Sequence, residues 1–375
     1  MKNKTIKSLI IAFLCACMLF TPTVNALALS NESTLISLQS NSGGSVEVGS
    51  RFFELIFGKK DKNKPSETIR LCLGGDAFGV KISGSGVTVS KIVHETAGAL
   101  LRADDKILSI DNQAISSISE VKNILNSSGG KALDFEILRN GKKINLNITP
   151  HAVGNEYHLG VILSDGASGI GTITYYDPET LAFGGLGHGI CEKDSQNVLK
   201  MTRGEVTGVI LSGARRGEAA KPGELRGVLT DKILGSVDKN TACGVFGTLK
   251  SEALSENSEY KRSVEVASRD EIKEGEATII STVKSGNKSE YGIEIYDIDR
   301  SSTESKSFKI RVTDDTLLAL TGGIVRGMSG SPIIQDGKLV GAVTHVMVAD
   351  PTEGYGIFIE NMLNAAQNQV IPKAA

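Results

Sequence analysis

The sequence predicts a mainly β protein, with an antiparallel sandwich or pair of barrels behind a smaller α/β domain. Short strand-like runs separated by turn residues recur through residues 160–297, with little helical periodicity between them, which is typical of antiparallel sheets. Glycine is abundant (42 residues), proline is scarce (8) and tryptophan is absent, as suits many strands joined by tight turns. The 375 residues leave room for two domains, and the hydrophobic content of 40% supports ordinary cores.

The charge balance and the cysteines exclude several classes of protein. A net charge of −2 gives no overall field that would attract nucleic acid or anionic lipid. Beyond the first 20 residues the cysteines are Cys72, Cys191 and Cys243, an odd number with no CxxC spacing. We therefore expect neither a disulfide framework nor a zinc site, and we predict free thiols, with one bridge as the alternative. No metal and no cofactor are predicted.

The N-terminal pattern is typical of a targeting segment. Three lysines within the first seven residues precede an apolar run at 9–20, and the small residues Val24 and Ala26 follow it. The run is shorter than the roughly 20 apolar residues that cross a membrane. We predict that residues 1–29 form a cleaved signal peptide, with an uncleaved membrane anchor as the alternative. In both cases the rest of the chain lies outside the cytoplasm.

A polar tether and then a small domain follow this segment. Residues 30–67 are rich in serine and asparagine and end in a lysine-rich run, which predicts a linker. Residues 68–150 have a different pattern: strand-like alternation, a glycine-rich loop, one amphipathic helix at 117–127, and a hairpin turning at Asn140-Gly141. This pattern predicts a compact α/β domain.

The 68–150 block resembles a PDZ domain, in which a peptide adds a strand to a sheet edge and its carboxylate is held by loop N–H groups. The loop departs from the usual Gly-Leu-Gly-Phe pattern, which leaves its peptide specificity open. The alternative is a domain that only spaces the remainder of the chain. The residues predicted to bind peptide are Gly74, Gly75, Phe78, Gly79 and Val80.

The remainder of the chain, residues 151–375, carries a serine in the setting that a nucleophile requires. Ser329 lies in Gly327-Met328-Ser329-Gly330, before an apolar run that predicts a strand. A nucleophilic hydroxyl must stand clear of the backbone, and neighbouring N–H groups must converge on one point to hold an oxyanion. Glycine reaches the necessary positive φ angles at little cost. A plain Gly-Ser turn between strands is the alternative.

A serine also needs a base, and the base needs a group that orients it. His188 lies between Gly187 and Gly189, where little bulk surrounds its ring; a structural histidine in a turn is the alternative. His345, on the strand after the serine turn, competes as the base or forms the pocket wall. Asp314 and Asp315 end a strand, and because adjacent strand residues point to opposite faces, at most one of them can orient the base.

These motifs together resemble the SpoIVB peptidase family (stage IV sporulation protein B). The similarity covers nearly everything after about residue 68 and rests on residues 186–189, 312–314, 321–332, 343–346 and 350–356. Cys191 and Glu192 depart from the residues expected after the histidine motif. The resemblance implies a chymotrypsin-like (trypsin-like) β-barrel peptidase domain behind a PDZ domain.

The resemblance also implies residue roles. Ser329 would be the nucleophile, His188 the general base and Asp314 its orienter, in the chain order that chymotrypsin-like enzymes use. The local geometry of such sites places the oxyanion hole at the N–H groups of Gly327 and Ser329.

The family's biology implies a place and partners for this chain. We expect a secreted or membrane-tethered serine endopeptidase of a spore-forming bacterium, facing the space between the forespore and mother-cell membranes. It would cleave itself in trans and a membrane-bound regulator, so that processing of pro-sigma-K begins, and an inhibitor protein would be a further partner. The alternative is a non-catalytic PDZ adaptor on a degenerate peptidase scaffold, although none of the three residues is missing.

Overall fold

The structure, a computed structural model, describes residues 69–93, 100–192, 197–253, 263–284 and 287–367. The predicted signal peptide or anchor (1–29) and the predicted tether (30–67) lie outside these residues. Within the described ranges, no helix is long and apolar enough to cross a membrane.

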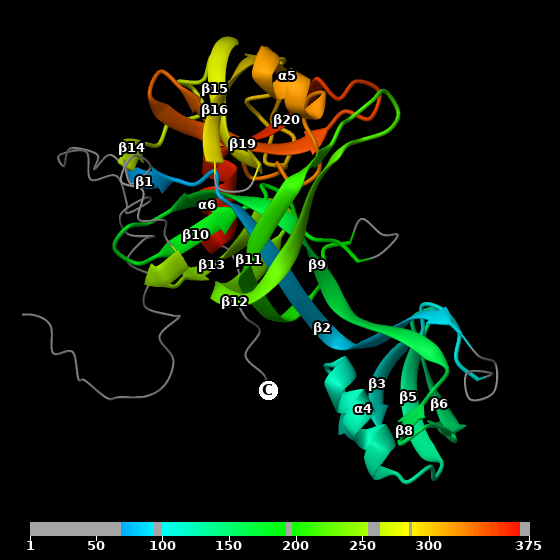
Figure 1. The fold of residues 1–375 in the computed structure, drawn as a ribbon. Coiled ribbons are helices and arrows are strands. Elements are labelled where there is room, and N and C mark those ends of the chain that lie inside the picture. Colours follow the sequence, from blue (N-terminus) through cyan, green and yellow to red (C-terminus); the bar gives the residue numbers. More distant parts are fainter. Residues whose placement is uncertain (1–68, 94–99, 193–196, 254–262, 285–286, 368–375) are drawn as a thin grey trace, which may run out of the picture. The chain divides into compact units, whose positions relative to one another are not determined.

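Six strands pair in a ring that returns to its first member, which makes a first barrel (Figure 1). Around the ring, β2 pairs with β9, β9 with β10, β10 with β13, β13 with β12, β12 with β11, and β11 with β2. The strands are β2 (Ala77–Ile92), β9 (Val161–Tyr176), β10 (Ala182–Gly185), β11 (Met201–Arg215), β12 (Glu224–Thr241) and β13 (Gly244–Leu249). The short β1 (Arg70–Leu73) pairs with β9 and with β14 (Ser263–Glu265). A 3-10 turn, η1 (Ser251–Ala253), follows β13.

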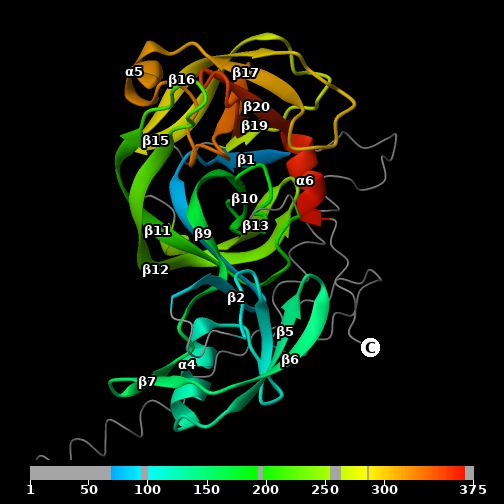
Figure 2. The ribbon, with the colours of Figure 1, turned by 90° about the vertical axis from the view of Figure 1, so that its right-hand side faces the viewer.

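Six later strands close a second barrel, drawn in yellow to red in Figure 2. Its strand order is β15 (Gly275–Lys284), β16 (Asn287–Tyr296), β17 (Phe308–Val312), β20 (Glu353–Phe358), β19 (Lys338–Val346) and β18 (Pro332–Gln335). Along these strands, side chains point alternately into and out of the barrel. Those that point inward are mainly aliphatic and include Phe308, and they fill the interior. The helix α5 (Asp315–Thr321) connects β17 to the loop that precedes β18. The predicted mainly β architecture is confirmed.

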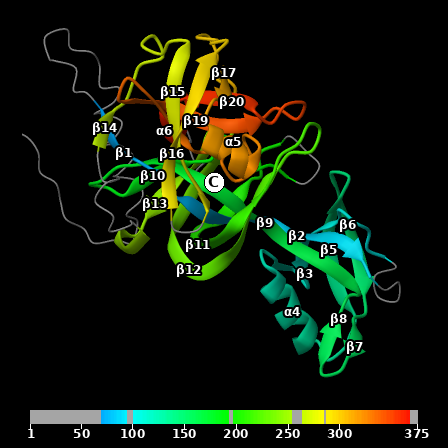
Figure 3. The same cartoon turned by 45° about the horizontal axis from the view of Figure 1, so that its top comes forward.

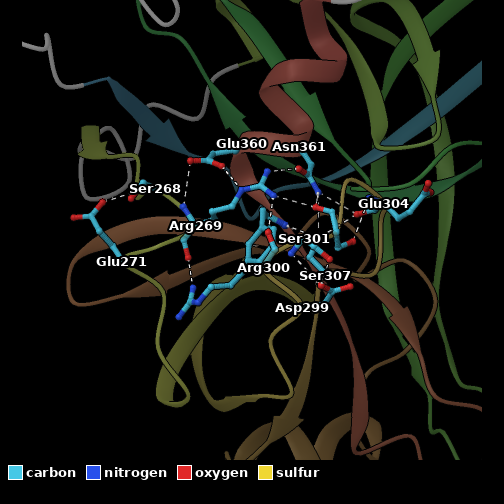
Figure 4. A network of polar contacts seen from close by, with 12 residues as sticks. Ser268, Arg269, Glu271, Asp299, Arg300, Ser301, Glu304, Ser307, Glu360 and Asn361 are labelled. Carbon is cyan, nitrogen blue, oxygen red and sulfur yellow. Dashed lines mark hydrogen bonds and ion pairs between the residues drawn. The ribbon is translucent and has the colours of Figure 1, made fainter. Parts of the chain in front are cut away.

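The C-terminal helix α6 (Ile359–Gln367) is fixed to the second barrel through Arg269 (Figure 4). The guanidinium of Arg269 donates to the Glu360 carboxylate at 2.6 Å and to Asn361 Oδ1 at 2.9 Å. It also lies 5.0 Å from the centre of the Phe358 ring, where a cation is attracted to the aromatic face. These contacts hold the helix in one position.

A shared hydrophobic cluster joins the two barrels. Apolar side chains of β1, β9 and β13 pack there against β19, β20 and α6. Its buried members include Leu71, Tyr175, Phe246, Leu339, Ile357, Ile359 and Met362. Because protein interiors are close-packed and resist deformation, this cluster fixes how loops from the two barrels meet.

The small domain is formed where β2 and β9 continue as paired strands beyond the first barrel (Figure 3). Its other elements are β3 (Lys106–Ile110), β4 (Gln113–Ala114), α4 (Ile118–Ser127), β5 (Leu133–Arg139), β6 (Lys142–Ile148), β7 (His151–Val153) and β8 (Glu156–His158). Ser117 caps α4 in a capping box with Glu120. The β5–β6 hairpin turns at Asn140 and Gly141, both with positive φ, as predicted.

The core of the small domain does not coincide with the predicted range of 68–150. Its buried cluster begins at Val87 and ends at Leu159, whereas Phe78 and Val80 are buried in the first barrel. In this structure Phe78, Val80 and Ile82 therefore pack with the first barrel, and the core of the small domain extends to Leu159. The reason is that β2 and β9 each run through two cores, and alternation shows a strand but not the sheet to which it belongs.

The residues predicted to bind peptide, within 74–80, lie in the first barrel in this structure. Gly74 and Gly75 donate their N–H groups to carbonyls of β9, and a Cβ on Gly74 would lie 2.0 Å from the Ile173 carbonyl oxygen. Gly79 is buried against Thr207 and Leu229. These glycines permit close approach of backbones inside the peptidase barrel, and they are not available to a peptide.

Candidate active site

The serine loop between α5 and β18 has its peptide groups fixed from both barrels. The carbonyl of Arg326 accepts a hydrogen bond from the N–H of Leu225 at 2.8 Å, at the start of β12. The carbonyl of Met328 accepts from both the N–H and the hydroxyl of Ser331, at 2.9 and 2.7 Å. Both peptide planes are therefore held in one orientation.

These two bonds orient the N–H groups predicted to form the oxyanion hole. In a trans peptide the N–H points away from the carbonyl of the same plane, so the N–H groups of Gly327 and Ser329 point away from Leu225 and Ser331. Neither N–H has a hydrogen-bond partner in the described part of the chain. Gly327 has a φ of 101°, which favours glycine. Two oriented donors without partners are what an oxyanion hole needs.

The hydroxyl of Ser329 is partly exposed, and it donates a 2.7 Å hydrogen bond to the carbonyl of Thr344 on β19. Among the residues that the structure describes, no hydrogen bond joins Ser329 to His188. Catalytic hydrogen bonds are often long or misaligned before substrate binds. In this structure the Ser329 hydroxyl is thus bonded to the Thr344 carbonyl and not to a histidine of the described residues.

His188 lies in a turn after β10, where Leu186 and Gly187 adopt left-handed φ angles of 65° and 67°. Its Nδ1 lies 2.9 Å from the carbonyl oxygen of Gly189, and a carbonyl can only accept, so Nδ1 carries the proton. Nε2 is then the basic nitrogen. Burial lowers the pKa of His188, an effect that the Gly189 carbonyl partly offsets. The ring is thus neutral and ready to accept a proton at neutral pH.

Asn240 anchors the histidine turn, and sequence reasoning missed it. Its buried side-chain amide accepts from the N–H of Ile190 at 2.9 Å and donates to the Ile190 carbonyl at 2.8 Å and the Leu199 carbonyl at 3.0 Å. This bidentate contact begins two residues after His188. The only sequence signal is a polar residue at a buried strand position, which local patterns do not reveal.

His345 lies beside His188, with the ring centroids 4.8 Å apart and the planes inclined by 39°. Burial, followed by the proximity of His188 and Lys306, lowers the pKa of His345 to about 4. Its Nδ1 is buried and has no hydrogen-bond partner within the described residues. His345 is therefore neutral at neutral pH, and its ring covers one side of the His188 ring.

Asp314 does not contact His188 in the described structure. Its carboxylate accepts the N–H of Leu317 at 2.8 Å and caps the N-terminus of α5, while the neighbouring Asp315 is exposed. In this structure Asp314 is thus a helix cap: it follows β17 and begins α5 in the second barrel, whereas His188 belongs to the first. An aspartate just before a helix can act as a helix cap, because its carboxylate accepts hydrogen bonds from the free N–H groups of the first turn.

In the described ranges, no group of three or more histidine, cysteine, aspartate or glutamate side chains is arranged to hold a metal ion. The Ser329 hydroxyl lies at the carbonyl of Thr344, next in the chain to His345, and the His345 ring lies beside that of His188. Among the described residues, the N–H groups of Gly327 and Ser329 have no partner. Such a set can carry out acyl transfer, in which serine is the nucleophile and an imidazole moves the proton.

Comparisons with known proteins agree with this geometry. The model of the family described as SpoIVB peptidase S55 matches residues 155–363, more than half of the chain, and a PDZ domain model matches residues 60–149. No curated protein matches the chain.

Several solved structures are similar to parts of the chain. The PDZ domain of the SdrC-like protein from Listeria monocytogenes is 25% identical, covering 21% of this chain and 88% of that one, with a TM-score of 0.20. The active form of the Rv3671c protease from M. tuberculosis is 13% identical, covering 56% of this chain and 78% of that one, with a TM-score of 0.31. The inactive form of Rv3671c is 13% identical, with coverages of 52% and 82% and a TM-score of 0.29.

The family model matches more than half of the chain, and this extent decides the classification. The chain belongs to the SpoIVB peptidase S55 family, and it is a serine peptidase.

Proposed function

We propose that this protein is a serine endopeptidase in which Ser329 is the nucleophile, His188 the general base, and the N–H groups of Gly327 and Ser329 the oxyanion hole. The observation that carries the proposal is the pair of N–H groups at the serine, which have no partner among the residues that the structure describes and are each oriented by a bond to the carbonyl of the same peptide plane. A Gly-Ser turn that only joins two strands has no reason to leave both donors free.

The first step of the reaction moves one proton and forms one bond. The Ser329 hydroxyl leaves the Thr344 carbonyl by rotation about its Cα–Cβ bond and donates to Nε2 of His188. As Oγ attacks the carbonyl carbon of the scissile peptide, Nε2 takes the hydroxyl proton. The carbonyl π electrons move onto oxygen, and this oxyanion accepts hydrogen bonds from Gly327 and Ser329.

The second step breaks the peptide bond. The imidazolium of His188 gives its proton to the leaving amine, and the acyl group remains on Ser329 Oγ. Water then repeats the sequence with His188 as base, releasing the acid and restoring the hydroxyl. During both steps the Gly189 carbonyl holds the proton on Nδ1, which is the tautomer that leaves Nε2 free to act.

Family membership supports a proposal about the physiological setting. We propose that the protein acts in sporulation signalling, exported through its N-terminal segment and either released or membrane-tethered. It would cleave itself in trans and a membrane-bound regulator, and the cleavage of that regulator would begin pro-sigma-K processing. The small domain, which matches a PDZ model, would recruit these partners by binding peptide.

The test follows the intact mass of the full-length chain over time, beside its Ser329→Ala twin. We expect the parent chain to be trimmed near its N-terminus while the twin stays whole. The twin should be cut when the parent is added, since the cleavage occurs in trans. If the parent also stays whole, alone and with membrane-bound regulator, the non-catalytic PDZ adaptor becomes the better account.

A further inference from the structure

One buried residue of the first barrel touches both halves of the candidate site. Thr172, on β9, is fully buried. Its hydroxyl donates to the carbonyl of Gly327 at 2.9 Å, and its N–H donates to the carbonyl of Ser329 at 2.9 Å. Its own carbonyl accepts the N–H of Leu186, two residues before His188, at 3.2 Å.

The two bonds to the serine loop fix the peptide planes on either side of the Met328–Ser329 plane. The Gly327 carbonyl, held by the Thr172 hydroxyl, sets the plane between the two proposed oxyanion donors. The Ser329 carbonyl, held by the Thr172 N–H, sets the plane that follows the nucleophile. With both neighbours fixed, the N–H of Ser329 has little freedom to turn away.

The third bond links this frame to the histidine turn. The Thr172 carbonyl, the Leu186 N–H and Gly330 are so close that a Cβ on Gly330 would lie 1.9 Å from that oxygen and 2.5 Å from that nitrogen. The serine loop and the histidine turn therefore both contact the same residue of β9, at the same edge of the strand. A shift of Thr172 would change the position of nucleophile and base together.

We propose that Thr172 is a positioning residue for the peptidase reaction, which uses its hydroxyl to hold the Gly327 peptide so that the oxyanion hole faces the substrate. This inference rests on the proposed roles of Ser329 and His188. Thr174, two residues along the same strand, provides a comparison within the chain. Its hydroxyl donates to the Gly330 carbonyl at 2.8 Å, beyond the serine and outside the peptides that carry the oxyanion donors.

The test compares Thr172→Val, Thr172→Ser and Thr174→Val in the full-length protein, with a fluorophosphonate as the probe. In this labelling, Ser329 Oγ forms a bond to phosphorus, fluoride leaves and His188 takes the hydroxyl proton, so the rate reports the nucleophile and the oxyanion hole without a known substrate. The maximal labelling rate and the half-saturating probe concentration are measured for each variant, together with its thermal midpoint.

We expect Thr172→Val to lower the maximal labelling rate roughly 10- to 100-fold, as small misplacements of reacting groups do, with the half-saturating concentration within about twofold. Thr172→Ser should restore most of the rate because it keeps the hydroxyl. Thr174→Val should lose a comparable amount of thermal stability, because it also leaves a buried carbonyl without a donor, but much less rate.

Two results would overturn the proposal. One is an unchanged labelling rate in a folded Thr172→Val protein. The other is an equal loss of rate in Thr172→Val and Thr174→Val that follows their thermal midpoints, which indicates a purely structural role. If Thr172→Val does not fold, Thr172→Cys replaces it, and an unchanged rate in that variant counts against the proposal equally. Failure of the proposed function is recognised separately, since the parent protein would then not label at Ser329.

Discussion

The serine loop and the histidine turn are held in place by different means. Consecutive peptide groups of the serine loop are bonded to partners on β9, β12 and β19, so the nucleophile's backbone and the oxyanion donors are prepared in advance. Within the described residues, the ring of His188 has one hydrogen bond, to the carbonyl of its own neighbour Gly189, and it lies beside the ring of His345. Under the roles proposed for these residues, the difference means that the oxyanion donors are already oriented before substrate binds, whereas the bond between Ser329 and His188 has still to form.

The largest effect should come from the nucleophile. Ser329→Ala should lower peptidase activity by on the order of 10⁶, as loss of the serine does in enzymes of this mechanism, while leaving the prepared backbone intact. Activity is measured by self-cleavage in trans, with circular dichroism as the control for folding. A variant that retains self-cleavage would contradict the assignment of Ser329.

The two histidines should differ strongly, although their rings are neighbours. His188→Phe should be almost as inactive as Ser329→Ala, because no base remains to take the hydroxyl proton. His345→Phe keeps an aromatic wall and should lose roughly tenfold or less. Fluorophosphonate labelling rates of the two variants decide the matter, and the reverse ranking would make His345 the base.

The pKa of His188 predicts the acid side of the activity profile. Because burial lowers that pKa below the ordinary value of 6.5, the ring stays unprotonated, and active as a base, at a pH where an exposed histidine has already charged. The midpoint of the acid limb of the labelling rate should therefore lie below 6.5. A midpoint above that value would show that the base is another group or is solvated differently.

His345 should make the fold sensitive to acid. Its pKa falls from 6.5 to about 4 in the folded protein, so above pH 6.5 neither state binds the proton and stability is unaffected. Between pH 6.5 and about 4, His345 is protonated in the unfolded chain but not in the folded chain. The free energy of unfolding therefore falls as the pH is lowered through this range. At about 1.4 kcal/mol for each tenfold change in proton affinity, the loss is on the order of 3 kcal/mol.

The measurement is urea unfolding at about pH 7 and about pH 4.5, in a Ser329→Ala background that prevents self-cleavage. Replacing His345 by Phe should remove much of the difference in unfolding free energy between the two pH values. An unchanged difference would mean that His345 is solvated or paired in the folded protein.

Substitution of Asp314 should have the smallest effect on activity. It also tests most sharply whether the histidine turn relies on a carboxylate. Since its carboxylate caps α5, Asp314→Asn should keep nearly full activity, because asparagine is an equally good cap. Asp314→Ala should cost about 1 kcal/mol of unfolding free energy, measured by urea unfolding. If Asp314→Asn instead loses about 10⁴ in rate, as an orienting carboxylate would, this aspartate reaches His188 during the reaction.

The sequence predicted those features that depend on neighbouring residues. The strand-rich composition, the Asn140-Gly141 hairpin and the glycines around Ser329 are local patterns, and the structure has the barrels, the hairpin and the serine loop. Ser329 and His188 could be selected because glycines near the serine allow positive φ angles and glycines on both sides of the histidine leave little bulk around its ring.

The features that could not be predicted from the sequence are those that depend on which strands and loops are neighbours in the folded chain. The role of residues 74–80 follows from β2 pairing inside the first barrel, and alternation alone does not name a strand's partners. Asp314 was assigned by its position along the chain, whereas its use as a cap depends on where β17 ends. Thr172 and Asn240 act on loops 155 and 50 residues away along the chain, and no local signal marks them.

The most direct test of the central claim is fluorophosphonate labelling of the full-length protein, followed by peptide mapping. The account predicts one phosphonylated residue, Ser329, with labelling lost in His188→Phe and retained in Asp314→Asn. Labelling that persists in His188→Phe, or that disappears in Asp314→Asn, would contradict an active site built from Ser329, His188 and a prepared oxyanion hole without an aspartate.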